Sequence, residues 1–107
     1  MNKPLETSRA PNESELLSLV VPVFNERSML PLFFEHVLPI LASLDIRSEI
    51  VVVDDGSEDG SAEFVRTFIK RKSSIRLVKL SRNFGKEAAV TAGLEHAKGD
   101  AVIVLDA

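Results

Sequence analysis

The segment EIVVVDDGSEDGS, residues 49–61, gives the strongest indication of the fold. Its first half is a run of β-branched residues that is apolar on both faces, as a central strand of a parallel sheet is. An acidic pair, Asp54 and Asp55, ends the run. The turn that follows contains Gly56 and Gly60, which can adopt the positive φ angles that turns use. A buried strand that ends on two carboxylates predicts a polar site at one edge of a sheet.

Strand-like and helix-like segments alternate along the rest of the chain. The expected strands are Leu16–Val23, Glu49–Asp55, Ser74–Leu80 and a buried strand Ala101–Leu105, and the expected helices are Ser28–Leu44, Ser61–Lys72 and Gly85–Gly99. Ser28 is expected to cap the first helix, and Pro39 to kink or shorten it. The order βαβαβαβ with short connections predicts an α/β fold, a Rossmann-like parallel sheet with right-handed crossovers.

Composition limits the class of protein. The chain has 107 residues, enough for one domain, with 45% hydrophobic and 27% charged residues. A net charge of −3 argues against a nucleic-acid partner, and the absence of cysteine excludes disulfides and thiolate metal sites. Residues 1–15 are polar and predict a flexible tail before a domain at 16–107. Every apolar run is shorter than the ~18 residues of a membrane span, so a soluble, cytoplasmic chain is expected.

The predicted topology gathers polar residues at one sheet edge. In an open parallel sheet, ligands bind beyond the carboxyl ends of the strands, where the strand order reverses. With the order 3-2-1-4, one crevice would collect Glu26, Asp54, Asp55 and Asp106. Carboxylates so close repel unless a cation joins them, and Mg²⁺ or Mn²⁺, completed by substrate phosphates, is the natural occupant. Arg82 and Lys86 would add positive charge for a diphosphate. Neither GxGxxG nor GxxxxGK[ST] is present, so a nucleotide would be held without a glycine-rich cradle.

Four motifs in this order resemble the N-terminal half of the family 2 glycosyltransferases, which have the GT-A fold. They are VVPVFNE (20–26), EIVVVDDGSEDGS (49–61), SRNFGKEAAVTAGLEHAKGD (81–100) and VIVLDA (102–107). The resemblance covers residues 16–107. The third motif is most similar to the polyprenyl-phosphate glycosyltransferases, the group of bactoprenol glucosyltransferase and dolichol-phosphate mannose synthase.

The resemblance implies a nucleotide-sugar site at matching positions. The positions that match the nucleoside pocket or lie beside it are Pro22, Phe24, Glu26, Val53, Asp54 and Asp55. Asp106 matches the first acid of the DXD motif, which holds the divalent metal on the donor diphosphate, and Ala107 matches its middle residue. Arg82, Asn83 and Lys86 are expected in a loop near the nucleotide.

The resemblance also implies an activity for a longer parent protein. That protein would transfer a sugar, glucose from UDP-glucose with GDP-mannose as the alternative donor, to a polyprenyl phosphate with inversion. The second acid of the DXD motif would be residue 108. The 107 residues are therefore expected to be the nucleotide-binding part of a longer chain or a truncated product, and to be inactive alone. The parent is expected at the cytoplasmic face of a membrane through C-terminal helices.

Two other classes compete with this interpretation. The segment VVVDDG also resembles the acidic pair of a response-regulator receiver domain, which binds Mg²⁺ at strand ends, but there the pair ends the first strand. The other alternative is a non-catalytic nucleotide-binding or assembly module. An exposed fourth strand is expected to allow pairing between chains.

Overall fold

The computed structural model describes residues 15–107, so the tail predicted at 1–15 lies outside the described residues except for Glu15. The elements are β1 Leu16–Val23, α2 Leu30–Ser43, β2 Arg47–Asp54, α3 Ser61–Ile69, β3 Ile75–Lys79, α4 Lys86–His96 and β4 Ala101–Val104. Strands and helices alternate, which confirms the predicted βαβαβαβ order. The expected helices and the third strand are each shorter by one to three residues at their ends, where helices and strands commonly fray.

The four strands form one parallel sheet in the order β3-β2-β1-β4. This is the order that was assumed from the sequence, and it places the reversal between β1 and β4. Val23 of β1 pairs with Asp54 of β2, and Val20 of β1 pairs with Val104 of β4. The carboxyl ends of β1, β2 and β3 therefore lie level, whereas β4 ends at the height of Val20, and Asp106, two residues beyond β4, reaches the height of Pro22.

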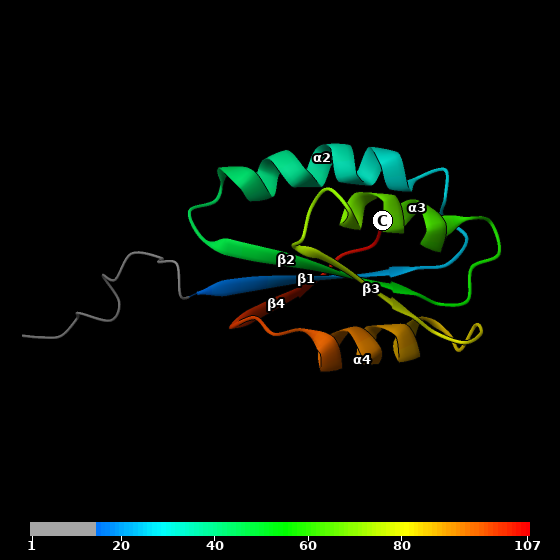
Figure 1. Cartoon of the computed structure of the whole chain (residues 1–107). Helices are drawn as coiled ribbons and strands as arrows, with labels where there is room; N and C mark the ends of the chain where they lie inside the picture. The colour runs from blue at the N-terminus through cyan, green and yellow to red at the C-terminus, as the bar shows by residue number, and fades with distance from the viewer. Residues whose placement is uncertain (1–14) are drawn as a thin grey trace, which may run out of the picture.

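Helices cover both faces of the sheet: α2 and α3 lie on one face and α4 lies on the other (Figure 1). On the α2–α3 face the core includes Val21, Val52 and Phe34, whose ring stacks on Phe68 with centroids 4.6 Å apart. On the α4 face, Val20, Val51, Val53 and Ala89 form a second buried cluster. Small residues let α4 approach closely, because a Cβ at Gly93 would collide with the side chain of Val20. Because helices cover both faces of the sheet, the central residues of β1 and β2, 19–21 and 50–53, are apolar on both faces.

Helix α2 differs from its prediction in two places, at its N-cap and at Pro39. Met29, not Ser28, is the N-cap, and no side chain caps the helix. The carbonyl of Glu26 instead accepts hydrogen bonds from the amides of Met29 and Leu30. The helix also continues through Pro39 to Ser43. Pro39 is exposed, so water can reach the backbone carbonyl that its missing N–H leaves free.

The prediction that the fourth strand is buried is wrong. Val102, Ile103, Val104 and Leu105 are 39–49% exposed. β4 is an edge strand with β1 on one side only, and no helix among residues 15–107 covers it as α2, α3 and α4 cover β1 and β2. Its apolar residues do not indicate burial in this chain.

Candidate functional site

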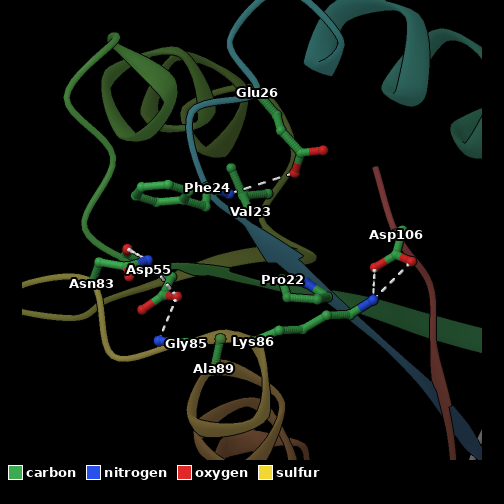
Figure 2. Close-up of a pocket in the computed structure, with 10 residues that line it drawn as sticks. All are labelled: Pro22, Val23, Phe24, Glu26, Asp55, Asn83, Gly85, Lys86, Ala89 and Asp106. Carbon is green, nitrogen blue, oxygen red and sulfur yellow. Dashed lines mark hydrogen bonds and ion pairs between the residues drawn. The ribbon is translucent and has the colours of Figure 1, made fainter.

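A pocket of about 430 Å³ lies at the carboxyl ends of β1 and β2, at the point where the strand order reverses. Its lining residues are Pro22, Val23, Phe24, Glu26, Asp55, Asn83, Gly85, Lys86, Ala89 and Asp106 (Figure 2). These residues come from four separate segments: the end of β1 with the loop after it, the residue after β2, the loop before α4 with the first turn of α4, and the segment after β4. Most of the residues predicted to surround a nucleotide meet here.

The loop after β1 forms one wall. Phe24 is 46% exposed, and Glu26 Oε1 lies 3.4 Å from its amide nitrogen. Asn25 has a φ of 52°, a left-handed conformation that asparagine tolerates. It is held on both sides, because its amide donates to Ser57 Oγ at 2.8 Å and its Oδ1 accepts from the amide of Glu58 at 2.8 Å. The wall that carries the Phe24 ring is thus tied to the turn after β2.

Asp59 continues this connection at the start of α3. Its Oδ2 accepts from the amide of Arg27, and its Oδ1 accepts from the amide of Ser61, both at 3.0 Å. Burial acts to raise the pKa of Asp59, but the hydrogen bonds from Ser61 and Arg27 outweigh it and lower the pKa below its ordinary value. The charged form of Asp59 therefore holds the two loops together.

Asp55 organises the opposite wall. It is 3% exposed, and its carboxylate accepts three hydrogen bonds from the loop between β3 and α4. Asn83 Nδ2 donates to Oδ2 at 2.9 Å, the amide of Gly85 donates to Oδ2 at 3.0 Å, and the amide of Phe84 donates to Oδ1 at 2.8 Å. The buried carboxylate thus fixes the loop that begins α4.

Two glycines allow this close contact. A Cβ on Gly56 would lie 2.5 Å from the carbonyl carbon of Arg82 and the nitrogen of Asn83, which is too close for any side chain. Gly85 has a φ of 105°, a conformation that side chains rarely adopt, and this angle turns its amide toward Asp55. The backbone of the two loops can meet only because both positions are glycine.

An ion pair closes the other end of the pocket. Lys86, the first residue of α4, places Nζ 2.8 Å from Oδ1 and 2.9 Å from Oδ2 of Asp106 (Figure 2). The side chains are 62% and 65% exposed. The pocket therefore has an aromatic ring and a buried carboxylate toward β2, and an exposed pair of opposite charges toward β4.

Four predicted residues do not line this pocket. Val53 is buried under α4, while Arg82 and Ala107 line neighbouring cavities. Asp54 is fully buried; its Oδ2 accepts from the amide of Ser57 at 3.3 Å, and its Oδ1 has no partner. The prediction that Asp54 joins the other carboxylates in one crevice is wrong, because consecutive residues of a strand point to opposite faces.

The expected cluster of metal-binding acids is also not formed. Among residues 15–107, no three or more His, Cys, Asp or Glu side chains lie close enough together to hold a metal ion. Asp106 provides a single exposed carboxylate, paired with Lys86. Mg²⁺ is often held by one or two carboxylates together with substrate phosphates and waters. Asp106 fits such a site, in which the ligand supplies most of the oxygens.

Three lining residues were not among the sequence candidates: Val23, Gly85 and Ala89. The glycine in SRNFGK was the available signal for Gly85, since a glycine just before a helix often marks a special backbone angle. Ala89 belongs to the small residues of α4, which were expected only to pack against the sheet. Val23 carries no signal, because an apolar strand residue looks the same inside a core and beside a pocket.

A separate buried cluster, at the amino ends of the strands, holds β4 in place. Glu49 Oε2 accepts from Ser18 Oγ at 2.6 Å and from the amide of Lys98 at 2.8 Å, and its Oε1 accepts from Arg76 at 2.9 Å. Ser18 Oγ also accepts from the amide of Gly99 at 2.8 Å. Burial acts to raise the pKa of Glu49, but the hydrogen bonds from Lys98, Ser18 and Arg76 lower it below the ordinary value.

The fold and the pocket define a class, a Rossmann-like α/β domain with its ligand site at the switch point of a parallel sheet. Residues 18–107 match the family model described as Glycosyl transferase family 2. The chain belongs to this family, whose members include enzymes that transfer sugars to undecaprenyl phosphate. The match decides against a receiver domain.

No helix among the described residues is both long enough and apolar enough to cross a membrane.

Curated relatives agree with the family. An undecaprenyl-phosphate 4-deoxy-4-formamido-L-arabinose transferase from Pseudomonas savastanoi pv. phaseolicola is 45% identical over 98 residues, 91% of this chain. An uncharacterized glycosyltransferase from Synechocystis is 43% identical over 91 residues, 85% of this chain. The chain spans 29% of the length of each of these relatives.

Solved structures of glycosyltransferases share the fold. A mannosyltransferase from Pyrobaculum calidifontis, in complex with GDP-Man and Mn²⁺, is 30% identical with a TM-score of 0.71 over 92% of this chain and 30% of its own. TarS from S. aureus, in complex with UDP-GlcNAc, is 26% identical with a TM-score of 0.67 over 84% of this chain and 26% of its own. The GT-A interpretation of the sheet and helices is therefore confirmed.

Proposed function

We propose that the pocket binds the nucleoside diphosphate part of a sugar nucleotide. The observation that supports this proposal is that chemically different groups line one cavity: the Phe24 ring and the Asp55 loop at one end, and Lys86 and Asp106 at the other. A base is flat and apolar on its faces, whereas a diphosphate is anionic. The pocket offers a partner for each at opposite ends.

Phe24 and Pro22 supply the surface for the base. The exposed Phe24 ring and the buried Pro22 both line the pocket wall. Any base can stack on an aromatic ring, because every base has a π-face. Glu26 and Asn83 line the same cavity and offer hydrogen-bonding groups to the base or ribose. Asp55, whose oxygens already hold the loop, keeps Asn83 in position.

Lys86 is the basic residue that lines the pocket, and it provides a charge-assisted hydrogen bond to a diphosphate. Asp106 would hold a divalent cation, Mg²⁺ or Mn²⁺, together with the phosphates. When bound, such a cation stabilises the negative charge of the departing diphosphate. The mannosyltransferase with Mn²⁺ among the structural neighbours supports this part of the proposal.

The parent protein, in this proposal, transfers the sugar to a polyprenyl phosphate with inversion. The undecaprenyl-phosphate transferases among the relatives support this acceptor. A phosphate monoester has a second pKa of about 6 and is largely ionised near neutral pH, so it needs little help from a general base. We propose UDP-glucose as the donor, GDP-mannose as the alternative, and the cytoplasmic membrane face as the location.

Calorimetric titration of UDP, UDP-glucose and GDP, each with and without Mn²⁺, tests the proposal. Phe24→Ala removes the ring that the base stacks on, and stacking worth about 1–3 kcal/mol predicts roughly tenfold weaker UDP binding. Phe84→Ala is the matched control, because Phe84 is 49% exposed on the adjacent loop and does not line the pocket.

The control should bind UDP as the wild type does. A folded wild-type chain that binds none of these nucleotides contradicts the proposal and favours a non-catalytic assembly module. An equal loss in both variants contradicts the stacking role of Phe24.

A further inference from the structure

We infer that Lys86 and a divalent cation exchange places on Asp106. Lys86 neutralises the carboxylate while no cation is bound, and it is released to the donor diphosphate when a cation takes the carboxylate. The inference rests on the proposed function. It adds that Lys86 couples the binding of the cation to the binding of the nucleotide.

The first observation is the geometry of the pair. Lys86 Nζ lies within 2.9 Å of both oxygens of Asp106, so it occupies the face of the carboxylate that a cation would use. A divalent ion and an ammonium group at the same face repel each other, since both are positive. The cation therefore binds only after Lys86 has left.

The second observation is how easily the pair opens. Both side chains are more than 60% exposed, at 62% and 65%. Exposed ion pairs contribute little to stability, and water replaces each partner at small cost. The binding of a cation by Asp106 together with phosphate oxygens releases more free energy than the opening of the ion pair costs.

The third observation concerns where Lys86 goes. Its backbone is fixed at the start of α4, because Asp55 holds the amides of Phe84 and Gly85 immediately before it. Only the flexible four-carbon stem can move, so the released ammonium stays at the pocket. Both oxygens of Asp55 are already engaged and do not compete for it. The released ammonium is then available to the diphosphate of a donor bound in the same pocket.

The experiment is a pair of titrations of the 107-residue chain, with Lys86→Met compared with the wild type. Titrating Mn²⁺ alone, the variant should bind about two- to fivefold more tightly, because its competitor for Asp106 is gone. Titrating UDP at saturating Mn²⁺, the variant should bind about tenfold more weakly, because the ammonium that contacts the diphosphate is gone. The effect of one substitution thus changes sign between the two titrations.

Lys72→Met is the matched control for charge. Lys72 lies just after α3, away from the pocket, and its removal changes the net charge equally. It should leave both affinities at the wild-type values. Asp106→Asn tests the pair from the other side: it should abolish the effect of Mn²⁺ on UDP affinity while leaving metal-free UDP binding equal to or tighter than that of the wild type, since Lys86 is then free.

The outcomes separate the two proposals. If the wild type binds UDP but Lys86→Met weakens Mn²⁺ binding, or leaves it equal to the Lys72→Met control, the exchange is overturned and the nucleotide site stands. If the folded wild type binds neither UDP nor GDP, both are overturned. Circular dichroism of each variant confirms that exposed substitutions leave the fold intact.

Discussion

Replacing Asp55 with alanine should loosen the loop that builds one wall of the pocket. The carboxylate accepts hydrogen bonds from Asn83 Nδ2 and from the amides of Phe84 and Gly85, at 2.8–3.0 Å. Alanine accepts none of them. The three donors must then turn to water or remain unpaired, and the loop loses its attachment to β2.

The magnitude follows from the number and burial of these bonds. A hydrogen bond to a charged group contributes about 1.5–3 kcal/mol, so three would contribute about 4.5–9 kcal/mol if they were independent. They share one carboxylate, and the loop is exposed enough for water to replace part of the loss. We therefore expect Asp55→Ala to lower the free energy of unfolding by about 3 kcal/mol, a large part of the ~5–15 kcal/mol typical of a domain.

Urea denaturation monitored by circular dichroism measures this change. With a slope of about 1.5 kcal/mol per molar urea, the midpoint should fall by about 2 M. Asp45→Ala is the control, because Asp45 is exposed in the α2–β2 connection, and it should change stability by less than ~0.5 kcal/mol. An Asp55→Ala protein that unfolds within ~1 kcal/mol of the wild type would refute the claim that Asp55 holds the loop.

Three further predictions follow from the same structure. The lowered pKa of Glu49 means that its contribution to stability is present above the unfolded-state pKa of about 4.3 and is lost as pH falls through the folded-state value. Urea titrations from pH 7 to pH 3 should show a steeper acid loss for the wild type than for Glu49→Gln; equal slopes would contradict this. Gly93→Ala should cost about 1–3 kcal/mol, because its Cβ collides with Val20, and an unchanged melting temperature would show that α4 packs differently. The exposed edge of β4 should make the isolated chain associate with a second copy, and Ile103→Lys should restore the monomer in light scattering; a wild-type monomer at high concentration would contradict the pairing.

The central strands could be predicted from the sequence because their burial is a local property of the pattern. The run from Ile50 to Val53 is apolar on both faces, and only a strand between two helical layers can hide it. Short connections and the handedness of crossovers predicted a parallel sheet, whereas the order 3-2-1-4 was assumed and is the order that the structure has. The position of the pocket then followed from topology alone, before any side chain was placed.

The errors arose where a residue's role depends on neighbours that the local pattern does not contain. The segment Ala101–Leu105 has the composition of a buried strand, yet it is an edge, because burial depends on what packs against it. Asp54 and Asp55 are adjacent in sequence, but the pleat sends only Asp55 into the pocket. The pairing of Lys86 with Asp106 joins residues 20 positions apart, so no spacing rule indicates it.

The most direct test of a nucleotide site at the switch point is a nitrogen-15 NMR spectrum of the chain with saturating UDP and a trace of Mn²⁺, whose unpaired electrons broaden nearby amide signals. We expect the signals of Lys86, Asp106 and Ala107 to disappear first, those of Phe24 and Asn83 to shift on addition of UDP alone, and those around Glu49 to remain unchanged. Broadening that centres elsewhere in the sheet, or a folded chain whose spectrum ignores UDP, would contradict a nucleotide site at the switch point.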